Sequence, residues 1–269
     1  MIKPILFFAV AIGCPAQTIQ FNPVERAFVE NVMANAPQKN ELRREAVQKY
    51  FEDVGCATSN LKVRGAKLPN LECVLPGKTS EQIIVGAHFD KTESSRGVVD
   101  NWTGAAMLPL LYRSLKADKH KYTFRFLAFT DEEKGLVGSN AYAVKMSKSD
   151  LASTLAMINL DSLGMTETKV WTSRADKTLL ELMAKLKYAM KLKVEGVNVE
   201  RVGSTDQEPF RKRQIRTLTF HSLTPENWPV LHSKRDNEEA LNLEYYYDSY
   251  RLVAAYLAYL DIALTSSGR

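Results

Sequence analysis

Three apolar runs in this chain alternate with segments of helical periodicity, and a histidine or an acid stands at or just past the end of each run. The runs cover residues 82–87, 122–129 and 154–160 and are rich in β-branched and aromatic residues, as buried strands are. Strands that alternate with helices pair in parallel, with the helices on both faces of the sheet. The chain is therefore predicted to be an α/β protein, folded as a three-layer α/β/α sandwich.

The periodicity of the remaining segments predicts further helices and shorter strands. In the last helix a tyrosine-rich stripe is expected to be a core face against the sheet. Helices are expected over 23–35, 38–54, 103–115, from near Ser139, over 175–191 and over 239–263, and additional strands over 56–63, 70–75 and 215–220.

Composition fits one globular domain and argues against nucleic-acid binding. A chain of 269 residues can bury a core large enough to be stable without disulfides or structural metals. The net charge of +5 comes from 36 basic and 31 acidic residues spread along the chain. The densest basic cluster, 211–213, has no aromatic or glycine-rich binding motif beside it, which predicts a solvated surface and no nucleic-acid partner.

The amino terminus has the pattern of an export signal. A basic start precedes a short apolar stretch over 5–13 and a small-residue boundary at Ala16. The apolar stretch is too short to span a bilayer. We expect residues 1–16 to be a signal and residues 17–269 to be a single exported domain, periplasmic or secreted. A lipid anchor at Cys14, after a weak lipoprotein box, and a retained amino-terminal strand are the alternatives.

Two cysteines remain after the predicted signal, Cys56 and Cys73, and both lie in short strand-like stretches. A hairpin would place them opposite each other, and an oxidising compartment permits a disulfide. Two unlinked thiols that pack as small apolar side chains are the alternative.

Histidine and aspartate follow the first apolar run in Gly86-Ala87-His88-Phe89-Asp90. Residues two apart on an extended chain point to the same side, so Asp90 is placed to accept one ring N–H of His88 and to fix its orientation. Asp100 opens the helix that follows, where helix-start N–H groups favour a negative charge. An ordinary helix cap is the alternative role for Asp100.

The acids that follow the second run, Asp131, Glu132 and Glu133, are harder to explain without a cation. Three acids directly after a buried strand repel one another, and a positive partner is the usual resolution. Asp161 follows the third run, where an unpaired carboxylate is costly. The late loop adds a further nitrogen ligand, His232.

Residues after the carboxyl ends of parallel strands share one crevice, so these side chains are expected to meet although they are widely separated in the chain. Nitrogen and oxygen ligands of this mixture suit zinc. His221, which ends a predicted strand, either reaches the same cleft or makes a structural hydrogen bond.

The order and spacing of these segments resemble the co-catalytic zinc aminopeptidases, metallopeptidase family twenty-eight, which include the bacterial leucyl aminopeptidases. The shared motifs are Gly-Ala-His-x-Asp, Asp-Asn-x-x-Gly, Glu-Glu-x-Gly-Leu-x-Gly-Ser, Asn-x-Asp and a late histidine, from about residue 80 to residue 236. The resemblance implies a mixed sheet, parallel at its centre, between helices. It also implies two zinc ions and hydrolysis of amino-terminal residues from peptides.

The resemblance implies a metal role for five residues. Asp100 is expected to bridge both zinc ions, with His88 and Asp161 completing one site and Glu133 and His232 the other.

Two further residues match catalytic positions of the family. Glu132 corresponds to the general base, and Asp90 to the acid that orients His88. The peptide bond between Asp100 and Asn101 is expected to be cis, as is frequent in this family.

Three parts of the chain depart from the family pattern, and one of them is Gln214-Ile215-Arg216, where Gly-Ile-Pro is usual. Residues 204–210 resemble the Ser-Asp-His-x-x-Phe stretch that lines the substrate pocket, but the spacing and the histidine differ. Trp102 stands where a small residue is more common, and we expect it to crowd the mouth of the site.

Two other functions are compatible with the same fold. Glutaminyl cyclases use one zinc and form pyroglutamate, but they typically have Asp-Ser where this chain has Asp100-Asn101. A non-catalytic scaffold loses metal ligands, whereas all five ligand positions are filled here.

Overall fold

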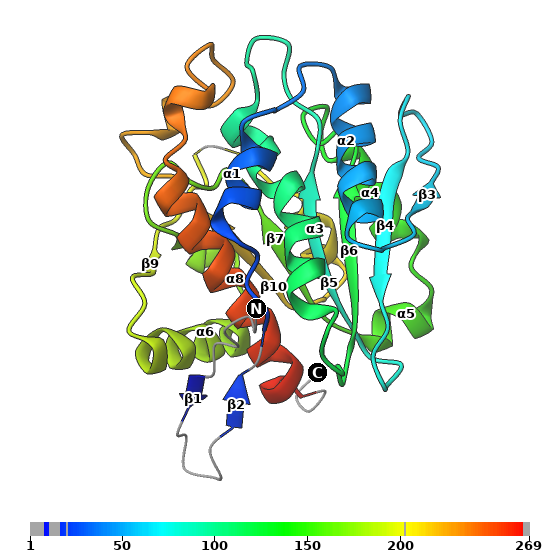
Figure 1. The fold of residues 1–269 in the computed structure, drawn as a ribbon. Coiled ribbons are helices and arrows are strands. Elements are labelled where there is room, and N and C mark those ends of the chain that lie inside the picture. Colours follow the sequence, from blue (N-terminus) through cyan, green and yellow to red (C-terminus); the bar gives the residue numbers. More distant parts are fainter. Residues whose placement is uncertain (1–7, 11–16, 20, 202, 266–269) are drawn as a thin grey trace.

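An eight-stranded mixed sheet runs through the part of the chain that a computed structural model describes, residues 8–10, 17–19, 21–201 and 203–265 (Figure 1). In their order across the sheet, the strands are β3 (Ser59–Leu61), β4 (Asn70–Leu75), β6 (Thr123–Phe129), β5 (Gln82–His88), β7 (Thr154–Leu160), β10 (Thr217–His221), β8 (Lys169–Val170) and β9 (Glu195–Gly196). The four central strands, β6, β5, β7 and β10, are parallel neighbours. β3, β4 and β6 pair antiparallel, as do β10 and β8.

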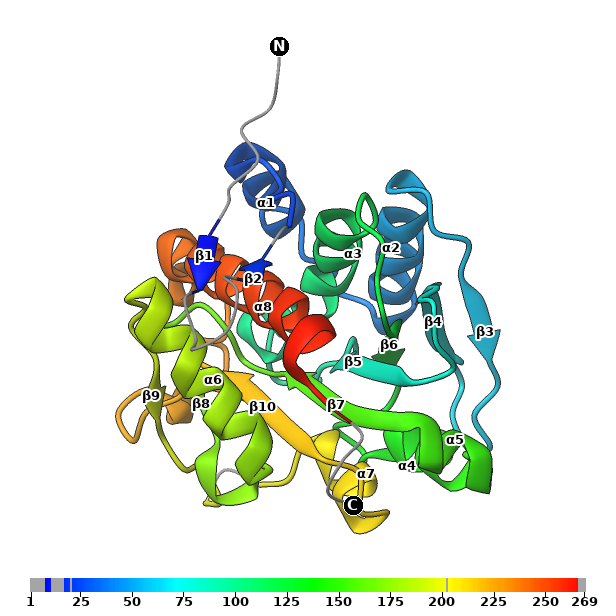
Figure 2. The ribbon, with the colours of Figure 1, turned by 90° about the horizontal axis from the view of Figure 1, so that it is seen from below.

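Helices cover both faces of this sheet (Figure 2). One face carries α1 (Arg26–Met33), α2 (Asn40–Asp53), α3 (Thr103–Leu115), α6 (Lys177–Met190) and α8 (Leu243–Ala263), and the other carries α4 (Val137–Lys145), α5 (Lys148–Ser153) and α7 (Gln207–Lys212). Two separate apolar clusters fill the two sides of the sheet. The predicted three-layer α/β/α sandwich, with a mixed sheet that is parallel at its centre, is confirmed.

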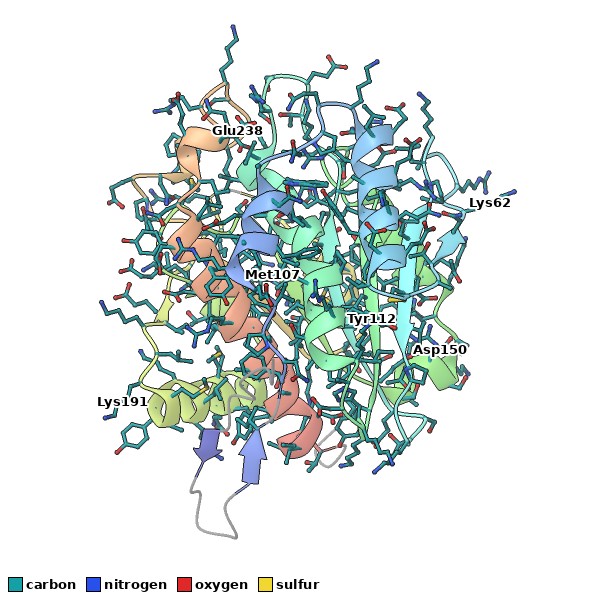
Figure 3. The ribbon with its side chains drawn as sticks, viewed as in Figure 1. Lys62, Met107, Tyr112, Asp150, Lys191 and Glu238 are labelled. Carbon is teal, nitrogen blue, oxygen red and sulfur yellow. A yellow bond between two sulfur atoms is a disulfide. The ribbon has the colours of Figure 1, made fainter. Side chains whose placement is uncertain are left out.

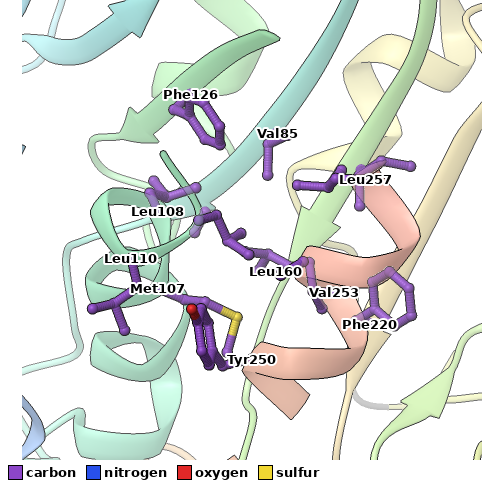
Figure 4. Packing of buried hydrophobic residues seen from close by; sticks show 14 of the residues in the cluster. Val85, Met107, Leu108, Leu110, Phe126, Leu160, Phe220, Tyr250, Val253 and Leu257 are labelled. Carbon is purple, nitrogen blue, oxygen red and sulfur yellow. The ribbon is translucent and has the colours of Figure 1, made fainter. Parts of the chain in front are cut away.

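The larger cluster lies between the sheet and the helices α3 and α8 (Figure 4). Met107 and Leu108 of α3, Val253 and Leu257 of α8 and Val85 of β5 all belong to this cluster, and all five side chains are buried. Each such burial removes an aliphatic side chain from water, which stabilises the fold by about 1.5–3 kcal/mol. This core fixes the central strands, and with them the loops that leave their carboxyl ends.

The tyrosine stripe of α8 is a core face, as its spacing predicted. Tyr246, Tyr250 and Tyr256 are fully buried. Their hydroxyl groups still find partners, since Tyr246 donates to the carbonyl of Thr103 at 2.8 Å and Tyr256 to that of Leu179 at 2.7 Å. A buried tyrosine needs such a partner for its polar end.

Most apolar side chains lie in the interior and most charged side chains lie at the surface (Figure 3). Met107 and Tyr112 of α3 lie in the interior, whereas Lys62, Lys191 and Glu238 point into solvent at the edges of the molecule.

Several short elements were not predicted. β8, β9 and α7 span only two, two and six residues, and the chain also contains short turns of helix at η1 (Val98–Trp102), η2 (Thr172–Arg174), η3 (Trp228–Val230) and η4 (Glu238–Ala240). The last helix begins later than the predicted residue 239, because Asn242 caps it by accepting from the N–H groups of Glu244 and Tyr245.

At the amino terminus, β1 (Phe8–Val10) pairs antiparallel with β2 (Gln17–Ile19). The predicted signal falls largely on residues 1–7 and 11–16, which lie outside the described residues, as does Cys14. The signal therefore stays a prediction. Among the described residues, no helix combines the length and the apolar character that crossing a membrane requires.

A disulfide joins Cys56, just after α2, to Cys73 in the middle of β4, with an S–S distance of 2.02 Å. Of the two alternatives for this pair, the structure has the linked one. The bond ties the helix layer to the antiparallel edge of the sheet.

Candidate metal centre

The side chains predicted to bind metal converge at the carboxyl ends of the parallel strands. His88 ends β5, Glu133 follows β6, and Asp161 follows β7. Asp100 lies in η1, at the start of the helix after β5, and His232 lies in the loop between η3 and η4. The five residues are widely separated in the chain, and the shared strand direction brings them together.

Asp100 lies at the centre of this cluster. Its Oδ1 is 3.2 Å from Nε2 of His88, and its Oδ2 is 3.2 Å from Nε2 of His232. Glu133 Oε2 lies 3.0 Å from the same nitrogen of His232, and Asp161 Oδ1 lies 3.9 Å from Nε2 of His88. The two oxygens of one carboxylate thus face two different histidine–carboxylate pairs.

Two sets of possible ligand atoms lie close enough to hold a cation. The atoms of His88, Glu132 and Asp161 lie within 4.8 Å of one another, and so do those of Asp100, Glu133 and His232. Oε1 of Glu133 is buried without a hydrogen-bond partner, which is costly unless a cation or a donor lies beside it. Neutral nitrogen and carboxylate oxygen donors in such groups fit zinc.

Asp90 contacts His88 and the backbone of the two glutamates that follow β6. Its Oδ1 lies 3.5 Å from Nδ1 of His88, so it is placed on the side of the ring that faces away from Asp100. The same carboxylate accepts the backbone N–H groups of Glu132 at 3.0 Å and of Glu133 at 3.2 Å. Asp90 therefore connects the loop after β5 with the loop after β6.

Asp236 supports the backbone at Asp100 through hydrogen bonds. Its carboxylate is fully buried and accepts the N–H of Val99 at 2.7 Å and of Asp100 at 3.3 Å. Burial, with a contribution from the charge of Asp100, raises the pKa of Asp236 to about 7. The sequence shows that Asp236 lies near His232, but it does not show that Asp236 holds the backbone at Asp100.

The turn at Asp100 has the backbone that the resemblance implied, since the peptide bond between Asp100 and Asn101 is cis. Asn101 donates to the carbonyl of Leu160 at 2.9 Å and accepts the N–H of Gly104 at 2.9 Å. A Cβ at position 104 would lie 2.5 Å from both Asn101 Oδ1 and the Leu160 carbonyl. The glycine of the Asp-Asn-x-x-Gly motif therefore allows the start of the helix to lie close against the end of β7.

The acids and histidines of the cluster shift one another's proton affinity. Burial raises the pKa of Glu132 well above its usual range, and burial raises that of Asp161 to about 6. Burial opposes ionisation of Asp100 too, but hydrogen bonds from His232 and His88 outweigh it and lower the pKa of Asp100. Hydrogen bonds to Asp100 and Glu133 raise the pKa of His232 to about 10. Burial therefore disfavours ionisation of Glu132 and Asp161, and a cation beside them would relieve this.

A cavity with polar and apolar walls opens directly beside these groups. His88, Asp100, Glu132, Asp161 and His232 form one wall, and its apolar walls come from Trp171, Val199, Leu223 and Leu231. Ser204 and Thr205, from the segment expected to line a pocket, also border it.

Thr205 is a residue whose role sequence reasoning missed. Its hydroxyl accepts from Asn159 Nδ2 at 2.8 Å and donates to Oδ2 of Asp161. The next residue, Asp206, is buried, and neither of its oxygens makes a hydrogen bond of normal geometry, although the Ser139 hydroxyl is near enough to favour its charged form. Burial raises the pKa of Asp206 to about 7.

His221 satisfies both alternatives considered for it. It borders the cavity, and both ring nitrogens are used structurally, Nε2 with the carbonyl of Val197 at 3.0 Å and Nδ1 with the N–H of Leu223 at 3.0 Å. Burial lowers its pKa to about 4, so the ring is neutral at physiological pH.

The expectation that Trp102 crowds the mouth of the site was wrong. Trp102 is fully buried and is not among the residues that border the cavity. Its indole N–H donates to the carbonyl of Val32 in α1 at 3.2 Å, and its ring lies 6.3 Å from that of Tyr50 in α2. The side chain points away from the cavity because η1 turns it into the helix layer.

The sequence pattern of peptidase family M28 matches residues 70–257 of this chain. Aminopeptidase YwaD of Bacillus subtilis is 28% identical to it over 178 residues, which are 62% of this chain and 38% of that relative. The solved structure of BSAP, a zinc aminopeptidase from Bacillus subtilis, superposes with a TM-score of 0.64 at 26% identity, over 70% of this chain and 48% of that one.

A second kind of enzyme has a similar fold. The structure of a glutaminyl cyclase from Porphyromonas gingivalis superposes with a TM-score of 0.66 at 18% identity, over 86% of this chain and 95% of the cyclase. At this identity the likeness concerns the fold alone. The present chain spans less than half the length of the two Bacillus proteins.

Proposed function

The chain belongs to peptidase family M28, and we propose that it is a zinc-dependent aminopeptidase, a hydrolase that removes amino-terminal residues from peptides. The observation that carries the proposal is the position of Asp100, whose two oxygens each lie 3.2 Å from a different histidine. A carboxylate shared in this way is suited to bridge two metal ions.

We assign two zinc ions to the centre. Asp100 with His88 and Asp161 would hold one, and Asp100 with Glu133 and His232 the other. Glu132 lies 4.0 Å from Nε2 of His88, about as far as Asp161 at 3.9 Å, so distance alone does not separate their roles. We assign proton transfer to Glu132 because it borders the cavity and matches the position of the general base in the family motif.

Bound zinc would act as a Lewis acid that makes a water acidic enough to ionise near neutral pH and favours negative charge on the scissile carbonyl oxygen. Glu132 would accept the proton of that water as it attacks the carbonyl carbon and then deliver the proton to the leaving amine. A carboxylate whose environment raises its pKa is suited to both halves of this transfer. Asp90 keeps His88 oriented and, through its hydrogen bond to the Glu132 N–H, keeps the base in place.

The cavity is the proposed binding place for the side chain of the amino-terminal residue. Trp171, Val199, Leu223 and Leu231 give it apolar walls, and its polar lining comprises metal ligands, Glu132, His221 and neighbouring hydroxyl groups. This distribution supports apolar amino-terminal residues as substrates.

We also propose that the chain works outside the cytoplasm, periplasmic or secreted. The disulfide between Cys56 and Cys73 supports this, because structural disulfides persist in oxidising compartments. The pattern of residues 1–16 adds the corresponding sequence signal.

The proposal is tested on the purified chain by measuring metal content and activity together. We expect close to two zinc ions per chain, release of amino-terminal residues from aminoacyl and dipeptide substrates, loss of activity with a chelator and recovery with zinc. A chain with one zinc that releases ammonia from glutaminyl peptides would be a cyclase instead. A chain that binds no zinc and hydrolyses none of these substrates would be a scaffold of the same fold.

A further inference from the structure

Arg43 near the start of α2 is a fully buried arginine that the proposed mechanism does not use. Among the described residues, no acid lies within ion-pair distance of its guanidinium. Its hydrogen bonds go to backbone carbonyls. Nε donates to the carbonyl of Phe89, and Nη2 donates to that of Gly97 at 2.8 Å. Nη1 lies 3.4 Å from the carbonyls of both Pro37 and Arg96.

The carbonyls of Phe89 and Gly97 mark the two ends of one loop. Phe89 directly follows His88 at the end of β5, and Gly97 directly precedes η1, which contains Asp100. The segment 89–97 is thus the whole connection between β5, which ends in the ligand His88, and η1, which contains Asp100. A planar guanidinium presents donors in a fixed fork, so one side chain can hold both ends at a set separation.

Trp102 closes the other side of this arrangement. The guanidinium carbon of Arg43 lies 5.4 Å from the centre of the Trp102 ring. The backbone N–H of Trp102 donates to the carbonyl of Gly97 at 3.1 Å, the same oxygen that Arg43 binds. The large residue at position 102 therefore packs on the arginine that holds the loop.

The positive charge of Arg43 is compatible with its buried position, because acids of the cluster lie nearby. Burial lowers its pKa to about 10, while the acids Asp236, Asp90, Asp100 and Glu133 act in the opposite direction. The group is therefore charged at neutral pH behind an acidic cluster. An isolated buried charge is costly, which makes a purely space-filling role for this residue unfavourable.

We propose that Arg43 is a positioning residue that sets the separation of His88 and Asp100 by tying together the two ends of the 89–97 loop, and that zinc affinity depends on it. The inference rests on the proposed metal centre. Its prediction is that loss of the fork hydrogen bonds weakens zinc binding even where the protein stays folded.

The test compares Arg43→Met and Arg43→Lys with the control Arg44→Met. Arg44 is the next residue of the same helix, it is less buried, and its bonds are to Gln48 and Asn60, away from the loop. Arg44→Met thus removes the same charge from the same helix. The readouts are the zinc dissociation constant from competition with a chelator, the absorption spectrum of the cobalt-substituted protein, and the melting temperature of the metal-free protein.

We expect both Arg43 variants to bind zinc about 10- to 100-fold more weakly, as is typical when partners behind metal ligands are removed, with an altered cobalt spectrum. Arg44→Met should match the wild type. Lysine keeps the charge but cannot reach both loop ends with a fork, so wild-type zinc affinity in Arg43→Lys would overturn the proposal. An equal fall in melting temperature with unchanged zinc affinity in both Arg43 variants would also overturn it.

A further variant covers the case in which neither Arg43 variant folds. Trp102→Leu keeps the arginine but removes the ring that packs on it, and we expect a smaller weakening of zinc binding in the same direction. Wild-type affinity in Trp102→Leu would then overturn the proposal. A wild-type chain that takes up no zinc would overturn this inference and the proposed function together, whereas normal zinc uptake by every variant overturns only the inference.

Discussion

Two adjacent glutamates, Glu132 and Glu133, differ in what they face. Glu133 Oε2 lies 3.0 Å from His232, and its other oxygen is buried without a partner, as expected for a ligand. Glu132 borders the cavity and has a raised pKa because it is buried. Two neighbouring residues thus have different proposed roles, one as a metal ligand and the other as a base.

Substitution of these neighbours separates the two roles. Glu132→Gln should keep zinc but lose about 10²- to 10⁴-fold in turnover, because an amide cannot accept the proton of the attacking water. Glu133→Gln, its matched control, should lose zinc as well. Zinc content is measured by elemental analysis beside kcat, and near-normal turnover in Glu132→Gln would refute the base assignment.

A second prediction at the residue scale concerns His221. Burial lowers its folded pKa to about 4 from the ordinary value of 6.5, so the folded state binds this proton less tightly than the unfolded state. Stability from the neutral ring is therefore present above about pH 6.5 and lost as pH falls toward 4. The loss amounts to about 3 kcal/mol, at 1.36 kcal/mol for each pKa unit.

Melting of the metal-free protein between pH 4 and pH 7 checks this. His221→Gln should lack this component, so its stability relative to the wild type should improve as pH falls. His120→Gln is the opposite control, because hydrogen bonds to Asp261 and Leu115 outweigh burial and raise the pKa of His120. The contribution of His120 is lost as pH rises. Parallel pH profiles for the wild type and His221→Gln would contradict a neutral buried ring.

Single residues were predictable where their motif is local. The spacing His88-x-Asp90 and the pair Glu132-Glu133 fix their geometry within a few residues of a strand end. Arg43 was not predictable, because the carbonyls it binds lie 46 and 54 residues farther along the chain. Trp102 was misjudged for the same reason, since the direction of its side chain depends on the turn at Asp100 and on packing against α1 and α2.

At the scale of elements, length decided what could be predicted. All seven positions of β5 and of β7 are buried, so their apolar runs are unambiguous. β8 and β9 have two residues each and show no periodicity that a sequence could reveal. β8 pairs with the edge of β10 and β9 pairs in turn with β8, because the edge of a sheet offers unpaired backbone groups to a neighbouring segment.

The link between α2 and β4 gives a prediction at this scale. Replacing Cys56 and Cys73 together with alanine removes a cross-link between residues 17 apart. By the chain-entropy argument such a loop contributes about 3 kcal/mol, mainly by restricting the unfolded chain. We expect the melting temperature to fall by about 6–12 °C, measured by calorimetry.

Cys73 pairs with Phe126 inside the sheet, whereas the cluster lies at and past the carboxyl ends of the strands, so zinc content and kcat of the doubly substituted chain should be unchanged at low temperature. The wild type in reductant serves as a control, and mass spectrometry without reduction should find no free thiol at either position. A double variant that melts with the wild type would show that the bond does not stabilise the fold.

For the whole molecule, the cluster at the strand ends is a source of instability without metal. Asp161, Asp206 and Asp236 have folded pKa values of about 6, 7 and 7, all raised chiefly by burial. Acids whose pKa is raised on folding favour the folded state only while they hold their protons. Their contribution is therefore lost as pH rises from the ordinary range near 4 through these values.

Zinc should reverse this dependence, because ligands bind metal in their deprotonated forms and metal affinity rises with pH. A zinc concentration one hundred times the dissociation constant adds about 2.7 kcal/mol of stability per site, or a rise of about 5–10 °C in melting temperature. We expect the difference in melting temperature between zinc-loaded and chelated protein to widen from pH 6 to pH 8, measured by calorimetry at fixed free zinc. The variant Asp100→Ala should show little difference at either pH, because it removes the carboxylate that faces both histidines. A difference that narrows as pH rises, or one that persists unchanged in Asp100→Ala, would mean that this cluster is not where zinc stabilises the protein.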